Sequence, residues 1–259
     1  MILSDRHRYV FVEMPHTGSY SIAKELQELY EGERILHKHA LYPQFLRSAS
    51  PEQRRYFVFS GVRNPLDEAV TLYFFARTNR YGHYTKPHKL RRREGGHITK
   101  ADLRKFSYAH EEGTDFASYF ERFYRRRKFY RLPYDNLSCV SHAQLDYVIR
   151  YERLDQDFAE VLRRLGLEQV RPLPRLNRTK QRQAEFAAYY PPELHERARW
   201  VFGPFMRRWD YEFPEGWGTS PVSPANELHF RALRAVRRLY WGRIGYHNPV
   251  LRWFEHFLP

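Results

Sequence analysis

The sequence predicts an α/β fold with a central, mainly parallel sheet that is flanked by helices on both faces. Two observations support this prediction. Short apolar segments rich in β-branched and aromatic residues alternate along the chain with segments in which apolar residues recur at helical spacing. The chain has 259 residues, of which 42% are hydrophobic and 17% aromatic, and this is enough for the core of one sizeable domain.

Four segments have the composition of strands, and helical patterns follow three of them. The expected strands are Arg8–Met14, Arg34–Ala40, Tyr56–Val62 and Leu145–Glu152. The expected helices are Ser21–Tyr30, Leu66–Arg77 and Gln156–Leu165, the last ended by Gly166 as its C-cap. Strands that alternate with helices are typical of a parallel sheet, because each connection must return to the same edge.

Two parts of the chain differ from the rest in composition. Residues 78–136 mix basic and aromatic side chains, and four aromatic residues among them keep helical spacing: Phe116, Tyr119, Phe120 and Phe123. After Pro214, a stretch rich in Gly, Ser and Pro resembles a linker, and Ala225–Trp241 has the pattern of an amphipathic helix. We therefore expect an α/β domain over residues 1–214 with an ordered insertion at 78–136, followed by a linker and helical extension over 215–259.

The charge of the chain indicates an anionic partner. The 44 Lys and Arg residues outnumber the 30 Asp and Glu residues, and the formal net charge is +14. This suits a nucleotide, a nucleic acid, an acidic glycan or a membrane surface. The one cysteine, Cys139, cannot form an internal disulfide, so a reduced, cytoplasmic setting is expected. No apolar run approaches the roughly 20 residues of a membrane span, and no signal peptide is evident, so a soluble protein is expected.

The segment FVEMPHTGSYSIAKELQEL, residues 11–29, joins the first expected strand to the first expected helix through a loop rich in hydroxyl residues. At the carboxyl edge of a parallel sheet, the N–H groups of such a helix N-terminus attract anions, phosphate above all. Gly18 permits close approach to the backbone, and three residues add hydroxyl donors: Thr17, Ser19 and Ser21. The alternative is an ordinary turn in which Ser or Thr caps the helix. The loop is not a Walker A sequence.

A second candidate anion site follows the third expected strand. Arg63 lies at the carboxyl end of that strand, Pro65 can open a helix, and Thr71 lies further along this helix. An arginine at this place can make a bidentate, charge-assisted contact to a phosphate, which a hydroxyl can share. Two anion sites on neighbouring strand ends describe a nucleotide that is phosphorylated at both ends.

The order and spacing of these motifs resemble the sulfotransferase family. Phe11–Ile22 is similar to the family's 5′-phosphosulfate loop, and Val62–Arg77 is similar to its 3′-phosphate motif. The segment HKHALYPQF, His37–Phe45, is similar to the His-x-His segment of the glycan 2-O-sulfotransferase branch. The similarity covers roughly Tyr9 to Pro214 and includes VIRYERLDQDFAEVLRRLGL, LPRLNRTKQ, YYPPEL and WDYEFP.

The resemblance implies a P-loop-like, three-layer α/β domain that transfers a sulfuryl group without a metal. The implied donor is 3′-phosphoadenosine-5′-phosphosulfate (PAPS), the product is 3′-phosphoadenosine-5′-phosphate (PAP), and the acceptor is a hydroxyl or amine of a carbohydrate or small molecule. The implied nucleotide-binding residues are Pro15, His16, Thr17, Gly18, Ser19, Tyr20, Ser21, Arg63 and Thr71. Arg178 and Lys180 would fold over the nucleotide end of the donor; the alternative for them is a basic surface loop.

His16 departs from the family pattern, in which a lysine usually follows the proline and steadies charge on the bridging oxygen as the donor breaks. An imidazole is shorter than a lysine side chain and must be protonated to supply the same positive charge. Two interpretations stay open. Either His16 donates a hydrogen bond to the leaving phosphate, or the site binds the nucleotide and turns over poorly.

His39 is the candidate general base, because an imidazole titrates near neutral pH and the resemblance places a catalytic histidine in this segment. His37 would lie on the same side if the segment were extended, since side chains alternate along a strand, and it could orient the acceptor or His39. The chain has 13 histidines, and the alternative for any one of them is a surface or hydrogen-bonded role.

The partners expected from the sequence are the nucleotide donor and a hydroxyl-bearing acceptor, such as an acidic glycan. The insertion at 78–136 is the expected acceptor-binding region, because aromatic rings interleaved with Arg and Lys suit sugars and acidic rings. The final helix would pack on the domain, self-associate or lie on an anionic membrane surface. Two other functions stay open, namely a catalytically impaired nucleotide-binding homologue and a basic nucleic-acid-binding protein.

Overall fold

The computed structural model describes residues 1–87, 98, 100–124, 145–174, 184–218 and 222–239. The chain divides into two compact units that alternate along the sequence. The first consists of Met1–Asn64, Asp135–Arg178 and Arg231–Arg252, and the second of Pro65–Tyr134, Thr179–Phe230 and Trp253–Pro259. The domain boundary expected after residue 214 does not coincide with a boundary between these units and stays a prediction. Within the described part of the chain, no helix is long and apolar enough to cross a membrane.

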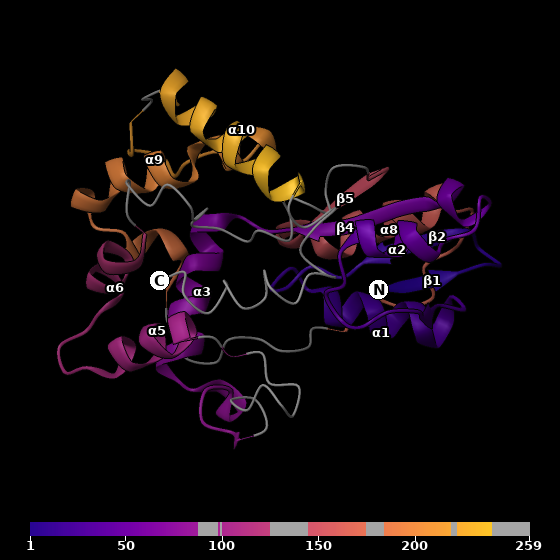
Figure 1. Ribbon diagram of the computed structural model, residues 1–259, viewed down its shortest axis with the longest axis horizontal. Helices are drawn as coiled ribbons and strands as arrows, with labels where there is room; N and C mark the ends of the chain where they lie inside the picture. The colour runs from indigo at the N-terminus through magenta and orange to yellow at the C-terminus, as the bar shows by residue number, and fades with distance from the viewer. Residues whose placement is uncertain (88–97, 99, 125–144, 175–183, 219–221, 240–259) are drawn as a thin grey trace. The chain divides into compact units, whose positions relative to one another are not determined.

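The first unit is built around a mixed sheet of five described strands (Figure 1). They are β1 (Ile2–Ser4), β2 (Tyr9–Val12), β3 (Glu33–Arg34), β4 (Phe57–Val62) and β5 (Tyr147–Arg150), in the order β3-β1-β2-β4-β5. Strands β2, β4 and β5 are parallel, whereas β1 runs antiparallel to both β2 and β3. The predicted α/β class and the parallel centre of the sheet are therefore confirmed.

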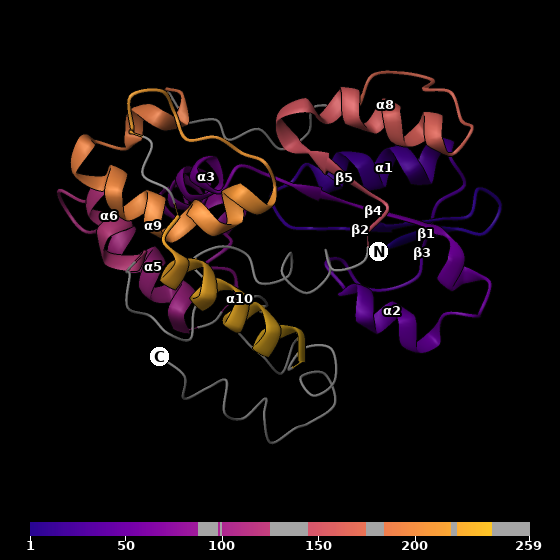
Figure 2. The same ribbon diagram turned by 90° about the horizontal axis from the view of Figure 1, so that it is seen from above.

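Helices cover both faces of this sheet, because successive residues of a strand point to opposite faces. Tyr9 and Phe11 of β2 share a buried cluster with residues of α1 (Ser19–Leu29) and α8 (Leu154–Arg164). Val10 and Val12 share a second cluster with residues of α2 (Tyr42–Ser48). Figure 2 shows α1 and α8 together on one side of the sheet and α2 on the other. The arrangement is compatible with a three-layer domain.

The predicted strand Arg34–Ala40 is wrong beyond its first residue. Only Glu33 and Arg34 pair with β1. The chain then turns, because the N–H of Ala40 donates to the carbonyl of His37 (3.1 Å) and His39 has a left-handed backbone with φ 63°. The other expected strands are confirmed with small shifts at their ends, whereas β1 and α2 were not predicted. These two elements have three and seven residues, too few for a periodic pattern to stand out.

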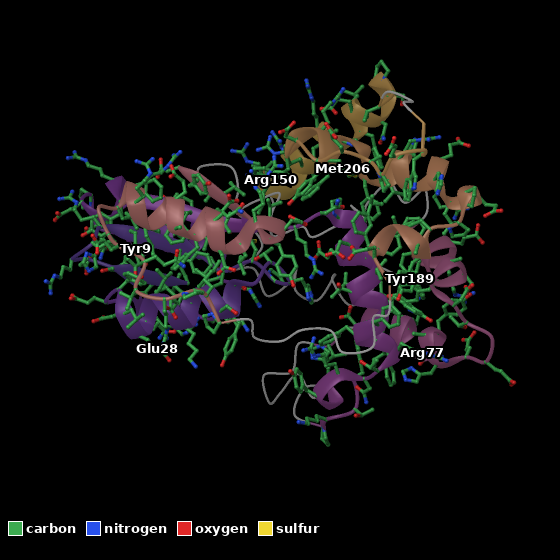
Figure 3. The ribbon with its side chains drawn as sticks, turned by 180° about the vertical axis from the view of Figure 1, so that it is seen from behind. Tyr9, Glu28, Arg77, Arg150, Tyr189 and Met206 are labelled. Atoms are coloured by element: carbon green, nitrogen blue, oxygen red, sulfur yellow. The ribbon has the colours of Figure 1, made fainter. Side chains whose placement is uncertain are left out.

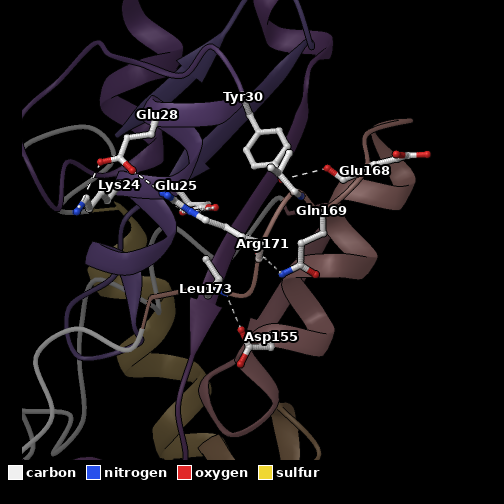
Figure 4. Close-up of polar contacts among 10 residues, drawn as sticks. Lys24, Glu25, Glu28, Tyr30, Asp155, Glu168, Gln169, Arg171 and Leu173 are labelled. Carbon is white, nitrogen blue, oxygen red and sulfur yellow. Dashed lines mark hydrogen bonds and ion pairs between the residues drawn. The ribbon is translucent and has the colours of Figure 1, made fainter.

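Arg171 anchors the chain after α8 to α1, as Figure 4 shows. Its guanidinium donates to both carboxylate oxygens of Glu25, at 2.9 and 3.0 Å, and also contacts Glu28. The carboxylate of Glu25 is fully buried, whereas Glu28 is half-exposed. The Tyr30 hydroxyl adds a bond to the carbonyl of Glu168 (3.0 Å). The end of the β5-α8 segment is therefore held to α1, the helix that follows the first loop.

This anchor predicts different effects for the two glutamates. Glu25→Gln is expected to lower the free energy of unfolding by about 2 kcal/mol, because it removes the charge of a fully buried carboxylate that accepts charge-assisted hydrogen bonds from the half-exposed Arg171. Glu28→Gln on the same helix contacts the same arginine from the surface, and it is the matched control with little expected change. Urea titration measures both variants. Equal losses from the two would contradict the importance assigned to burial of Glu25.

The second unit is helical in its described part. It contains α3 (Pro65–Arg77), α5 (Lys100–His110), α6 (Phe116–Phe123) and α9 (Pro192–Arg208), with 3-10 turns η2 (Arg80–Gly82) and η5 (Phe186–Tyr189). Two further turns, η1 (Gln53–Arg55) and η4 (Tyr151–Arg153), belong to the first unit. The last described helix, α10 (Pro224–Leu239), has residues in both units. The helices predicted at Leu66–Arg77, around Phe116, and from Ala225 are confirmed.

Aromatic rings fill the interior of the second unit. Figure 3 draws the side chains of this unit and labels two of its residues, Arg77 and Tyr189. The ring of Tyr73 in α3 has its centroid 5.8 Å from that of Phe116 and 5.2 Å from that of Tyr119. Phe116, Tyr119 and Phe120 are buried. These three residues of the predicted acceptor-binding insertion are therefore core residues, and recognition of an acceptor would have to use other side chains.

Candidate functional site

The carboxyl ends of the three parallel strands place three short segments at one edge of the sheet. Strand β2 leads into residues 13–18 and then α1, β4 leads into Arg63 and Asn64, and β5 leads into η4. All of these residues belong to the first unit. In open α/β sheets, ligands bind outside the carboxyl ends of the strands. This edge is the candidate site.

Residues 15–18 form a tight turn that ends at the N-terminus of α1. Gly18 is the N-cap of α1 and has φ 76°, a left-handed conformation that favours glycine. A Cβ at this position would lie 2.9 Å from Cδ2 of Leu154 at the start of α8, so the leucine side chain would have to move to admit it. No side chain caps α1, and the Thr17 hydroxyl instead donates to the carbonyl of Met14 (3.0 Å). The alternative of a Ser or Thr cap is therefore wrong for this helix.

The N-terminus of α1 is chemically suited to an anion. A helix of 11 residues carries a positive partial charge at this end, because the N–H groups of its first turn point away from the helix. Ser19 and Ser21 lie in this turn and are buried. A phosphate or sulfate here would meet backbone donors and a favourable dipole together.

Gly61 of β4 allows the loop after β2 to lie directly on the neighbouring strand. A Cβ on this glycine would lie 2.6 Å from Oγ1 and 2.8 Å from Cβ of Thr17, closer than side chains can approach. The Ser60 hydroxyl donates to the carbonyl of Val12 (2.6 Å) at the end of β2. The ends of β2 and β4 are thus packed together, and the position of the loop depends on a residue without a side chain.

Arg63 links the two segments that the sequence marked as anion sites. It is only 7% exposed, and its Nη1 donates to the carbonyl of His16 (3.1 Å) in the loop after β2. Its guanidinium carbon lies 4.2 Å from the centre of the Tyr151 ring, a cation–π contact to the segment after β5. The N–H of Asn64 donates to Oε1 of Glu152 (2.8 Å). The guanidinium is therefore held at the carboxyl edge from two sides.

His39 is bound to the residue that directly follows β2. Its Nδ1 lies 2.9 Å from the carbonyl oxygen of Glu13. A carbonyl oxygen only accepts hydrogen bonds, so Nδ1 carries the proton and Nε2 is the basic nitrogen of the neutral ring. Burial lowers the pKa of His39, and Lys38 acts in the same direction, against the Glu13 carbonyl, which raises it. A neutral imidazole with this tautomer is suited to accept a proton.

The remaining predicted site residues are placed as follows. Pro15 lies in the turn before α1, and Tyr20 is 49% exposed in the first turn of α1, where Nζ of Lys38 lies 5.1 Å from its ring centre. His37 opens a turn that contains His39, so the segment is not extended and the condition for placing the two histidines on one side is not met. Thr71 is buried in α3 and belongs to the second unit, whereas Arg63 belongs to the first.

Arg178 and Lys180 lie outside the described residues, as does Cys139. Sequence reasoning missed Tyr151, whose one sequence signal is its position near the carboxyl end of the expected strand Leu145–Glu152. Among the described residues, no group of three or more His, Cys, Asp or Glu could hold a metal ion. Comparisons with protein families, with curated proteins and with solved structures found no match to this chain.

Proposed function

We propose that this chain is a sulfotransferase that binds PAPS at the carboxyl edge of its sheet. The observation that carries the proposal is the hydrogen bond from Arg63 Nη1 to the carbonyl of His16 (3.1 Å). It joins the segment that resembles the 3′-phosphate motif to the segment that resembles the 5′-phosphosulfate loop. Two anion-binding segments that meet in this way suit one nucleotide with a phosphate at each end.

In this proposal, different residues of the first unit bind the two ends of the donor. The loop of residues 15–18 and the first turn of α1 would bind the 5′-phosphosulfate through backbone N–H groups and the helix dipole. Arg63 would bind the 3′-phosphate as a charge-assisted donor, because its guanidinium has five N–H groups in a planar fork. A P-loop-like fold belongs to the same proposal. The mixed sheet with helices on both faces supports it.

His39 is the proposed general base. Nε2 of the neutral ring accepts the proton of the acceptor hydroxyl while the hydroxyl oxygen forms a bond to the sulfur of PAPS. The bond between this sulfur and the bridging oxygen breaks, and PAP leaves. His16 would donate a hydrogen bond to the leaving phosphate. The lowered pKa of His39 supports this role, because it keeps the ring unprotonated near neutral pH. The proposed acceptor is a hydroxyl of a carbohydrate or small molecule.

Titration calorimetry with PAP tests the proposal. The wild-type protein is expected to bind PAP more tightly than adenosine 5′-phosphate, which lacks the 3′-phosphate. Arg63→Gln is expected to weaken PAP binding about 100-fold, because a hydrogen bond to a charged group contributes about 1.5–3 kcal/mol and a guanidinium can make two. It should change the affinity for adenosine 5′-phosphate much less.

The matched control is Arg164→Gln. Arg164 stacks on the ring of Tyr147 at 4.7 Å, at the amino end of β5, just as Arg63 stacks on Tyr151 beyond the carboxyl end of the same strand. This control should leave the affinity for PAP unchanged. The proposal would fail if wild-type protein produced no heat with PAP, or if Arg63→Gln weakened both nucleotides equally.

A further inference from the structure

Helix α10 presents an apolar side that the described structure leaves exposed. Leu228, Val236 and Leu239 are 69%, 63% and 54% exposed. Their spacing, with Ala232 between them, places them along one side of the helix. Three large apolar side chains in a row on a surface indicate an interaction site, whereas single exposed apolar residues do not.

A different side of the same helix is buried. Asn226, Phe230 and Leu233 are buried, and Nδ2 of Asn226 donates to the carbonyl of Trp200 in α9 (2.6 Å). The exposed apolar side is therefore not needed to hold the start of α10 in place. Of the roles left open for this helix, packing on the domain is therefore carried by a side other than the apolar row.

Arginines border the exposed apolar side. Arg231, Arg234 and Arg238 recur at helical spacing, and Arg231 and Arg238 are exposed. Glu227 is the acidic residue of this helix, and it forms an ion pair with Arg207 of α9. The helix thus combines an apolar row with a basic row along its length, in a chain with a formal net charge of +14.

We propose that α10 lies on an anionic lipid bilayer, with Leu228, Val236 and Leu239 inserted at the level of the headgroups. The three arginines contact lipid phosphates and carboxylates, and their aliphatic stems extend beside the apolar row. This inference does not depend on the proposed transfer reaction. The exposed side of α10 would contact the anionic partner through its arginines and bury its apolar side chains in the same contact.

Charge complementarity favours lipid over the other occupants. If a second copy of the chain packed its α10 on this side, the arginine rows of the two copies would lie close together. They would repel each other, since each copy carries a formal charge of +14. A nucleic acid would satisfy the arginines and leave the apolar side chains in water. An anionic bilayer satisfies both rows at once, because charge lies at its surface and hydrocarbon directly below.

Vesicle co-sedimentation of the full chain tests the proposal. Vesicles of phosphatidylcholine with about one third phosphatidylserine are compared with vesicles of phosphatidylcholine alone. We expect binding to the anionic vesicles that weakens when salt is raised, because the contribution of the arginines is screened. Arg231→Gln, Arg234→Gln and Arg238→Gln combined should lower the partition coefficient about 100-fold, since each basic residue near the surface contributes about fivefold.

Two matched controls separate this surface from general charge and exposure. Arg6→Gln, Arg8→Gln and Arg163→Gln combined remove the same net charge from exposed positions elsewhere and should lower partitioning far less. Leu228→Ser should lower it markedly, whereas Val170→Ser, at a residue that is 68% exposed against 69% for Leu228, should not.

The proposal would be overturned by three results. One is equal partitioning into neutral and anionic vesicles. The second is equal loss of binding in the α10 variants and the matched controls. The third is a wild-type dimer in sedimentation equilibrium that Leu228→Ser converts to a monomer, without any vesicle binding, because the occupant would then be a second copy. Circular dichroism of each variant confirms that lost binding is not lost folding.

Discussion

His39→Ala is expected to lower transfer of label from radiolabelled PAPS by about 10²–10⁴-fold, the usual contribution of a general base. The assay uses a panel of glycans, small alcohols and phenols as acceptors. Affinity for PAP should stay within about twofold, because the imidazole is proposed to act on the acceptor hydroxyl and not on the donor. The structural basis is Nδ1–H bound to the Glu13 carbonyl at 2.9 Å, which leaves Nε2 as the basic atom.

His195→Ala is the matched control for this substitution. Nε2 of His195 also lies close to a backbone carbonyl, that of Tyr190 (3.0 Å), and the residue belongs to α9, outside the expected acceptor-binding insertion. Transfer by this variant should equal that of the wild type. If His39→Ala transferred label as fast as His195→Ala, His39 would have no role as a base, although the nucleotide site could still stand.

The pH dependence of transfer follows from the direction of the His39 pKa shift. Burial lowers this pKa below the usual 6.5, so the ring stays neutral and able to accept a proton at pH values where an exposed histidine is already half protonated. The acid limb of the rate profile should therefore lie below pH 6.5. For stability, the unfolded chain binds the proton more readily than the folded one, so His39 makes the free energy of unfolding fall as pH drops through this range. A limb above pH 6.5 would contradict the assignment.

Gly61→Ala is expected to lower the free energy of unfolding by about 2 kcal/mol and to weaken PAP binding together with it. The added methyl group would lie 2.6 Å from Oγ1 and 2.8 Å from Cβ of Thr17, so the loop that contains Thr17 must move away from β4. Because this loop forms the proposed phosphosulfate site, stability and nucleotide affinity should change together. Urea titration and calorimetry measure the two effects.

The double variant Thr17→Gly with Gly61→Ala tests this cause. Removing the Thr17 side chain removes the two side-chain atoms that crowd the new methyl group. The free energy of unfolding lost in the double variant should therefore be about 1 kcal/mol smaller than the sum of the losses in the two single variants. Gly113→Ala is a comparison without crowding, since no atom lies within 4 Å of its Cβ position and the left-handed φ of 74° alone opposes the change. Strict additivity of Thr17→Gly and Gly61→Ala would show that the clash is relieved in another way.

Much of the fold could be predicted because its signals are local. The β-branched and aromatic run of β4 and the helical spacing in α1, α3 and α8 each lie within one segment, and each element appears within a few residues of its expected bounds. The turn at Gly18 has a left-handed backbone, which a glycine adopts without strain. Segments too short for a period, such as β1, and a strand pattern cut off by the turn at His39 were mispredicted, because packing and turn geometry there outweigh composition.

The order of residues along the chain specifies which chemical groups follow the strands: a loop of hydroxyl residues around a glycine after β2, and an arginine after β4. How these groups meet depends on contacts between distant segments. Arg63 reaches the carbonyl of His16 across 47 positions and stacks on Tyr151, and His39 is held by the Glu13 carbonyl. The exposed apolar side of α10 was likewise decided in three dimensions. Periodicity and propensity act between neighbours along the chain, whereas these contacts depend on which distant segments the sheet and core bring together.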